Sequence, residues 1–192
     1  MKLTGYEDLR VQRTIKSIYR AFEELIVEKD YRKITVTELA RKAMINKKTF
    51  YRYYPTLDDL LAEMQARYSQ EYLKTIQNFE YPRDINKSIR TFFEFSAKQG
   101  PAYDKITISG SYNGIRQQMI NQVMRHTWGA SLEFKQMTVF EKKVLLNFIE
   151  KTGLDIYIQW VKDGRKEKLD NVIAYATALM SGGVEKLLKQ HN

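Results

Sequence analysis

Two short helices, separated by a three-residue break and followed by a proline, restrict the fold of this 192-residue chain more than any other feature. Thr35 and Glu38 match the capping box, in which a threonine hydroxyl and a glutamate three positions later satisfy free backbone N–H groups. Asn46 is a candidate N-cap for the next helix, and Pro55 disfavours helical backbone in the residue before it. The pattern predicts helices from about Val36 to Ala43 and from Asn46 to Tyr54.

Longer amphipathic helices flank this pair. Before it, apolar residues recur three and four positions apart, which predicts one face of a helix; they are Ile15, Ile18, Phe22, Leu25 and Ile26. After it, Thr56 and Asp59 repeat the capping pattern and start a helix predicted to run from about Leu57 to Phe79. Three compact helices with a short break before the third are typical of a helix-turn-helix.

The third of these helices combines aromatic and basic residues. It is too short to be stable alone, so Phe50 and Tyr54, four positions apart, are predicted to anchor it in the core. The residues left exposed suit DNA phosphates and base edges; they are Lys47, Lys48, Thr49, Tyr51 and Arg52. Residues 1–56 also carry +6 of the net charge of +9, which favours a polyanionic partner. The alternative interpretation is a small helical bundle with solvated lysines and an aromatic core.

The stretch ITVTELARKAMINKKTFYRYYPTLDDLLAEM resembles the DNA-binding segment of TetR-family transcriptional regulators, and the detailed match covers about residues 11–64. The resemblance implies an all-α fold, with an N-terminal three-helix helix-turn-helix DNA-binding domain and a larger C-terminal helical domain for ligand binding and dimerisation. The corresponding ranges are residues 1–56 and 57–192, with Leu57–Phe79 as the connecting helix.

The resemblance also implies roles for single residues. Thr35 and Tyr51 occupy positions that meet backbone phosphates, and Arg52 occupies a variable position that often adds a contact. The first turn of the recognition helix, which enters the major groove, holds Lys47, Lys48 and Thr49.

Two residues depart from the family pattern. Met44 stands where the family usually has glycine, and a left-handed backbone at that position would cost a methionine about 1 kcal/mol. Leu57 stands where the family often has a phosphate-contacting lysine, so one backbone anchor is expected to be missing. Lys48, at a position that is often small, is a candidate replacement for that charge.

The rest of the chain is predicted to be helical at about residues 83–100, 115–128, 138–163 and 168–189. The last two of these helices are apolar over so much of their girth that they are expected to contact more than their own core. In TetR-like proteins the last two long helices form a four-helix dimer interface; the residues predicted for it are Leu145, Ile149, Ile156, Trp160, Val172, Ala176, Leu179, Gly183, Val184 and Leu187. The alternative is that both helices complete the core of a single chain.

A TetR-like C-terminal domain commonly binds a small molecule that alters DNA affinity. Large apolar side chains are the usual lining of such a pocket; the candidates are Phe92, Tyr103, Met119, Phe148 and Tyr157. Each of them also suits an ordinary core position, and the sequence does not identify the effector.

No enzyme site is predicted. The chain has no cysteine and only two histidines, His126 and His191, so no catalytic residue, metal site or cofactor is expected. The N-terminus lacks the apolar segment of a signal peptide, and the longest apolar run is too short to cross a membrane. A cytoplasmic location is therefore expected, and the absence of cysteine fits it.

Together these patterns predict a homodimeric transcriptional regulator, a repressor that binds a palindromic operator in double-stranded DNA and responds to a small-molecule effector. One alternative is a TetR-like adaptor controlled by a protein partner, which the dense basic first third of the chain disfavours. Another is an α-helical enzyme or lipid carrier, which would need a large cavity with convergent polar groups.

Overall fold

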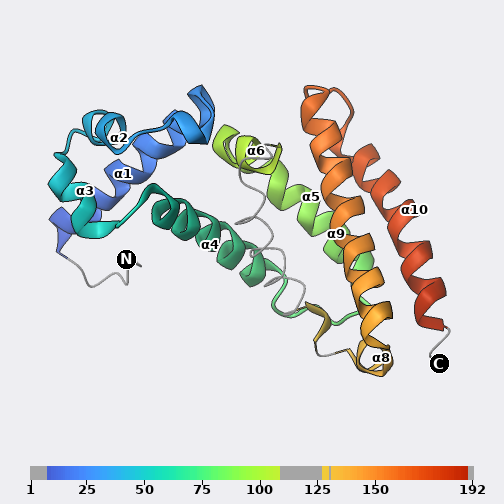
Figure 1. The fold of residues 1–192 in the computed structure, drawn as a ribbon. Coiled ribbons are helices and arrows are strands. Elements are labelled where there is room, and N and C mark those ends of the chain that lie inside the picture. Colours follow the sequence, from blue (N-terminus) through green and yellow to red (C-terminus); the bar gives the residue numbers. More distant parts are fainter. Residues whose placement is uncertain (1–7, 109–126, 130, 190–192) are drawn as a thin grey trace. The chain divides into compact units, whose positions relative to one another are not determined.

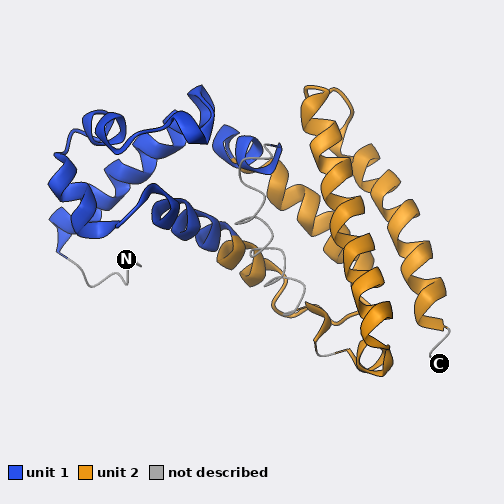
Figure 2. Ribbon diagram, in the orientation of Figure 1, with its two compact units in different colours: residues 1–68, 100–116 blue, residues 69–99, 117–192 orange. Residues whose placement is uncertain are grey.

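The computed structural model describes residues 8–108, 127–129 and 131–189. The regular elements within these ranges are α-helices and one short 3-10 helix, with no strand among them (Figure 1). The all-α prediction is thereby confirmed. The chain divides into two compact units, unit 1 with residues 1–68 and 100–116 and unit 2 with residues 69–99 and 117–192 (Figure 2).

Unit 1 contains the helix-turn-helix. Its described elements are α1 (Leu9–Glu28), the 3-10 helix Tyr31–Lys33, α2 (Val36–Lys42), α3 (Lys47–Tyr53), the first part of α4 (Leu57–Thr75) and α6 (Pro101–Ile108). The predicted apolar face of α1 is buried, together with Leu39 of α2, Phe50 of α3 and Leu60 and Leu61 of α4. One core therefore holds all the helices of this unit.

The turn between α2 and α3 brings the backbone into a left-handed conformation at Met44, where φ is 56°. The N–H groups of Met44 and Ile45 donate to the carbonyl oxygens of Arg41 and Ala40 at 3.1 and 2.9 Å. These two bonds close the end of α2 as a Schellman motif, whose left-handed position is normally a glycine. A methionine there is strained by about 1–2 kcal/mol. Because 82% of its surface is exposed, burial of the apolar side chain offsets little of this strain.

The sequence pattern does not predict α6. Gly100 and Pro101 are expected to end a helix, but Pro101 instead begins α6, where its missing N–H and its fixed φ are tolerated. Ala102 and Ile106 join the core of unit 1. The Tyr103 ring packs edge-on against Tyr68, with their centroids 5.2 Å apart. A helix distant in sequence thus completes this core.

The end of α4 also differs from the prediction. The helix ends at Thr75 rather than Phe79, and tighter bonds follow, in which the N–H of Phe79 donates to the carbonyl of Ile76 at 3.0 Å. Asn78 is a weak helix former and Pro82 cannot continue a helix, which accounts for the earlier end.

Unit 2 contains the last part of α4, α5 (Ile85–Ala97), α8 (Leu132–Gln136), α9 (Val139–Lys162) and α10 (Leu169–Leu188). Of these, α8 is not anticipated by the sequence pattern, and the helix predicted at residues 115–128 falls almost wholly outside the described residues. A capping box begins α9, with the Thr138 N–H donating to Glu141 at 2.8 Å and the Glu141 N–H donating to the Thr138 hydroxyl at 3.3 Å. α10 packs against both α5 and α9, and Figure 1 shows it beside α9. Gly153 of α9 faces Met180 of α10, where a Cβ would lie 3.5 Å from the methionine methyl group, an ordinary van der Waals contact.

The end of α9 repeats the motif found after α2. Gly164 (φ 73°) and Arg165 (φ 55°) are left-handed, and their N–H groups donate to carbonyl oxygens of α9 at 3.0 and 2.9 Å. The Arg165 guanidinium donates to the carbonyl of Ala97, at the end of α5, and to the Tyr157 hydroxyl, both at 3.3 Å. It also lies 5.1 Å from the centre of the Trp160 ring. These contacts of Arg165, here named the Arg165 clamp, tie the turn between α9 and α10 to α5.

The compact units and the predicted domains are divided at different points. The boundary between the units lies within α4, after Tyr68, because Leu60, Leu61 and Met64 of α4 belong to the core of unit 1. The functional division between residues 56 and 57 stays a prediction.

Candidate nucleic-acid interface

One side of α3 is fixed to the core of unit 1. Phe50 and Tyr54 are buried there, and their ring centroids are 5.8 Å apart. At the start of the helix, the Asn46 side-chain oxygen accepts the Thr49 N–H at 2.7 Å and the Thr49 hydroxyl at 2.9 Å. The position and the first turn of this short helix are therefore both determined by contacts inside the unit.

The other side of α3 is cationic and accessible. Lys47, Lys48 and Arg52 are exposed, and Tyr51 is 53% exposed. None of these three cations forms an ion pair with any residue that the structure describes. Their charges are thus available to an anion from outside the unit.

The lysines of unit 1 that lie behind this surface have acidic partners instead. Lys42 contacts Glu28 at 2.5 Å and Glu24 at 3.3 Å, and the hydrogen bond to Glu28 is the main cause of its raised pKa. Lys29 contacts Glu38 at 2.5 Å, which lowers the pKa of that carboxyl. Lys29 and Lys42 are therefore compensated by acidic residues, whereas the cations exposed on α3 are not.

Thr35 is exposed at the start of α2, where its hydroxyl accepts the Glu38 N–H at 3.2 Å. The N-cap prediction is correct, but the Glu38 carboxylate turns to Lys29 at 2.5 Å. The residues predicted to bind DNA therefore sit at the starts of α2 and α3 and on the outer side of α3. Thr49 differs from the others, because it is half-buried and its hydroxyl is engaged by Asn46.

A polar cluster behind α3 was not predicted from the sequence. The hydroxyl groups of Tyr19 (α1) and Tyr54 (after α3) both donate to the same oxygen of Glu63 (α4), at 2.8 and 3.3 Å. Burial raises the pKa of both phenols, and the Glu63 carboxylate adds to the effect. The cluster links three helices and fixes the end of α3. The one sequence feature that could have indicated this cluster is the tyrosine, Tyr19, within the apolar face of α1.

The predicted ligand-pocket residues that the structure describes are divided between the two units. Phe92 and Tyr157 do pack together in unit 2, with ring centroids 6.0 Å apart. Tyr103 belongs to the core of unit 1, and Phe148 is partly exposed on α9. Met119 lies outside the described residues.

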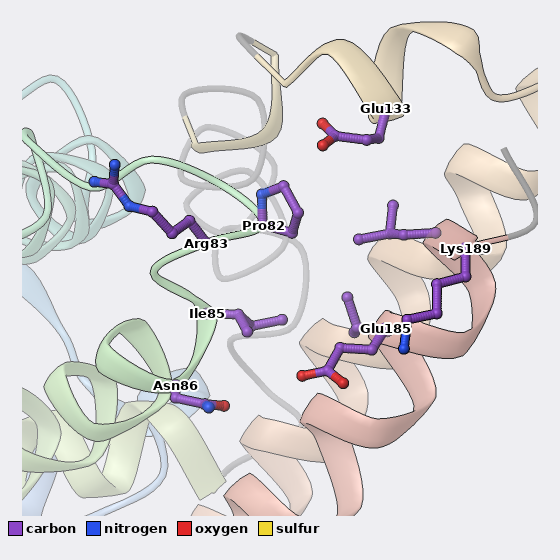
Figure 3. A pocket seen from close by; sticks show the side chains of 9 residues that line it. Pro82, Arg83, Ile85, Asn86, Glu133, Glu185 and Lys189 are labelled. Carbon is purple, nitrogen blue, oxygen red and sulfur yellow. The ribbon is translucent and has the colours of Figure 1, made fainter. Parts of the chain in front are cut away.

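Unit 2 has a hollow of about 270 Å³ where the start of α5, α8 and the end of α10 meet (Figure 3). Its rim carries charges of both signs, from Arg83, Glu133, Glu185 and Lys189, around an apolar floor. Arg83 is already paired with Glu80 at 2.8 Å. None of the predicted pocket residues lines this hollow.

The predicted interface residues fall into two groups. The protomer itself buries Leu145, Trp160, Val172, Ala176 and Val184, which therefore serve the core of unit 2. Ile149, Ile156 and Leu187 are half-buried, whereas Leu179 and Gly183 are exposed. Beside these two lie exposed apolar side chains that were not predicted for the interface; they are Phe140, Val144, Phe148 and Tyr175.

Neither a metal site nor a membrane span is found in the described ranges. No group of three or more acidic residues, histidines or cysteines could hold a metal ion there. Neither His126 nor His191 is among those residues. None of the helices searched is long and apolar enough to cross a membrane.

Comparison with known proteins identifies the family of the segment that contains α2 and α3. Residues 17–64 match the model of the family described as bacterial regulatory proteins, tetR family. A curated relative, the uncharacterized HTH-type transcriptional regulator YxbF of Bacillus subtilis (strain 168), is 32% identical over 80 residues. That match covers 41% of this chain but only 21% of the relative.

Solved structures match over nearly the whole chain. A TetR transcriptional regulator from Streptococcus agalactiae has a TM-score of 0.67 at 16% identity, covering 89% of this chain and 95% of its own. FadR from Bacillus subtilis, solved with stearoyl-CoA, has a TM-score of 0.65 at 16% identity and covers 86% and 96%. NalD of Pseudomonas aeruginosa, the secondary repressor of a multidrug efflux pump, has a TM-score of 0.66 at 16% identity and covers 90% and 97%.

At such low identity these structures establish the fold, while the family model identifies the helix-turn-helix. The fold, the caps of α2 and α3 and the matched segment all agree with the resemblance seen in the sequence. Residues 17–64 therefore carry the helix-turn-helix of the tetR family of bacterial regulatory proteins, and the proteins that the chain resembles are transcriptional regulators.

Proposed function

We propose that this regulator is a cytoplasmic repressor that binds a palindromic operator as a homodimer and releases it when a small molecule binds unit 2. The exposed cations of α3 carry the proposal. Lys47, Lys48 and Arg52 have no acidic partner in the described chain, so DNA phosphates and guanine edges can satisfy them. Thr35 and Tyr51 would contact phosphates. Because the Thr49 hydroxyl donates to the side chain of the N-cap residue Asn46, we assign its methyl group, rather than the hydroxyl, to a base contact.

The dimer would form through an apolar strip on α9 and α10. Phe140, Val144 and Phe148 recur every four residues along α9, so they share one side of that helix, and all three are exposed. Tyr175 and Leu179 of α10 are 57% and 62% exposed. The two halves of the strip meet where the Phe148 ring lies against Gly183, since a Cβ at that glycine would come within 3.2 Å of the ring. A self-complementary strip forms a two-fold dimer, which suits a palindromic operator.

The effector site would lie among the aromatic residues of unit 2. Phe92, Phe93 and Tyr157 pack together at centroid distances of 5.2 to 6.4 Å, and Tyr72 packs against Phe92. Such a lining favours an apolar ligand. The similarity to FadR solved with stearoyl-CoA agrees with an apolar effector without identifying it, because the two chains share only 16% identity.

A TetR-like adaptor that responds to a protein partner is the second candidate. It would account for the exposed apolar strip without a dimer. It gives no reason for three exposed cations on one helix whose other side is anchored in the core, and we therefore prefer the operator-binding protein.

Selection from a randomised DNA library, followed by affinity measurements at two salt concentrations, tests DNA binding. Lys47→Ala should cost about 1–3 kcal/mol on the selected operator and blur one base pair in each half-site. Tyr51→Phe should weaken binding to all sequences about equally, because it removes a phosphate contact. Lys166→Ala, an exposed lysine of unit 2, is the control. Unchanged affinity after combined alanine substitution of Lys47, Lys48 and Arg52 would exclude α3 as the recognition helix.

Sedimentation velocity at micromolar concentration tests the dimer. Leu179→Glu places a charge within the exposed strip and should convert dimers to monomers, because an unpaired carboxylate in an apolar interface is costly. Leu132→Glu is a matched control, since Leu132 is 72% exposed but lies on α8, outside the strip. A wild-type protein that sediments as a monomer would contradict the dimer and favour the adaptor.

A further inference from the structure

Met44 combines two features that are unfavourable in the free protein. Its backbone is left-handed (φ 56°), a conformation that glycine adopts without strain. Its side chain is 82% exposed and belongs to no apolar cluster of unit 1. Strained residues of this kind concentrate at functional sites, where the strain supports a role outside local folding.

The contrast with Arg165 supports this interpretation. Among the described residues these two are the only non-glycine positions with positive φ. The Arg165 side chain contacts Ala97, Tyr157 and Trp160, so interactions inside unit 2 offset its conformation. The Met44 side chain makes no comparable contacts within unit 1, which indicates a partner outside the unit.

The position of Met44 indicates which partner. It lies two residues before Asn46, the N-cap of α3, and three before the exposed Lys47. The turn that carries Met44 therefore enters any complex in which the start of α3 meets DNA. A thioether is flexible and polarizable and adapts to irregular apolar surfaces. Operator DNA offers two such surfaces near a recognition helix, the thymine 5-methyl groups of the major groove and the deoxyribose edges.

We infer that Met44 makes an apolar contact with the operator and adds to the affinity of each half-site. The contact rests on the proposed function, because it needs α3 to bind DNA. It implies that the residue which weakens the turn in the free protein strengthens the complex.

Binding of the selected operator by Met44→Gly, Met44→Asn and Met44→Leu tests the contact. The glycine and asparagine variants should bind about five- to tenfold more weakly, as expected when burial of a methionine side chain is lost. Because both residues accept a left-handed backbone, neither should be less stable than wild type. Asparagine also controls for the added flexibility of glycine. Leucine, which keeps an apolar side chain, should retain most of the affinity.

Operators in which single thymines are replaced by uracil locate the contact. A loss at one thymine per half-site that occurs with wild type but not with Met44→Gly assigns the thymine methyl group. A deficit of Met44→Gly that is the same on every substituted operator assigns the deoxyribose. Equal affinity of wild type, Met44→Gly and Met44→Asn would overturn the inference while leaving operator binding intact. If wild type selects no operator at all, the proposed function fails first.

Discussion

The turns that follow α2 in unit 1 and α9 in unit 2 are closed by the same pattern of backbone hydrogen bonds but have different side-chain surroundings. Both close a helix with a Schellman motif. Met44 occupies the left-handed position of the first motif, whereas Gly164 occupies it in the second and Arg165, the next residue, is also at positive φ. Arg165 donates two hydrogen bonds and lies over the Trp160 ring, whereas the Met44 side chain points into solvent. A non-glycine residue at positive φ is thus held by side-chain contacts in unit 2 and is left exposed in unit 1.

The exposed surfaces of the two units differ in the same sense. In unit 1, α3 presents exposed cations that have no acidic partner among the described residues, and in unit 2, α9 and α10 present exposed apolar side chains. A charged surface suits a polyanion, and an apolar strip suits a second protein surface. The division of labour between DNA and dimer contacts that we propose follows this difference.

Among the substitutions that test this comparison, Arg165→Gly is expected to change the free energy of unfolding the most. The substitution relieves the left-handed strain, worth about 1 kcal/mol, but removes charged hydrogen bonds and a stacked guanidinium worth roughly 3 kcal/mol in sum. A net loss of about 2 kcal/mol follows. Both tryptophans of the chain, Trp128 and Trp160, lie in unit 2, so urea unfolding followed by tryptophan fluorescence reports on that unit.

Arg165→Lys serves as the companion variant. Lysine keeps the charge and the strain but lacks the planar fork that reaches two oxygens at once. It should therefore also destabilise unit 2. If Arg165→Gly proved as stable as wild type, the clamp would contribute nothing, and the contrast between the two turns would be lost.

A smaller effect of opposite sign is expected from Met44→Gly. Here no internal contact is lost, so relief of strain should stabilise unit 1 by about 1 kcal/mol, less the added entropy of the unfolded chain. Hydrogen exchange of the amides in α1 to α3 measures this change. Met44→Ala, which keeps a Cβ at the strained position, should show no gain, and a destabilised glycine variant would indicate an internal role for the methionine.

The smallest expected effect is a change of stability with pH. It concerns the ionisable groups that hold each unit together. The Arg165 guanidinium stays charged at every pH used for proteins, whereas unit 1 depends on the buried hydroxyls of Tyr19 and Tyr54. Because both phenols have pKa values raised above the ordinary 10.0, their contribution is complete below pH 10 and is lost as the pH rises beyond it. Helix content measured by circular dichroism should therefore fall as the pH rises above 10. Unit 2 contains a buried phenol with a raised pKa as well, Tyr81, so the variant that follows is needed to assign the effect to unit 1.

Tyr19→Phe removes one of these ionisable groups and should reduce the alkaline sensitivity of unit 1. Its stability at neutral pH should fall slightly, since a hydrogen bond to Glu63 is lost. An alkaline loss of helix content that is unchanged in Tyr19→Phe would show that the tyrosine cluster does not contribute to this sensitivity.

The sequence by itself determined the features that depend on neighbours along the chain. The caps at Thr35, Asn46 and Thr138 and the stop at Gly164 were all predictable, because each is set by bonds that span only a few residues. The burial of Phe50 and Tyr54 followed from their spacing on one short helix. These local features together predicted the helix-turn-helix and carried the resemblance to the tetR family.

Only the tertiary structure decided which surfaces the long helices present. α9 is apolar around most of its circumference, so periodicity could not separate Leu145, which unit 2 buries, from Phe148, which it leaves partly exposed. The same holds for Glu63, which binds a tyrosine 44 positions away, and for Arg165, which reaches a carbonyl 68 positions away. Such contacts depend on how distant segments pack, and a sequence pattern records only the spacing of residues within one segment.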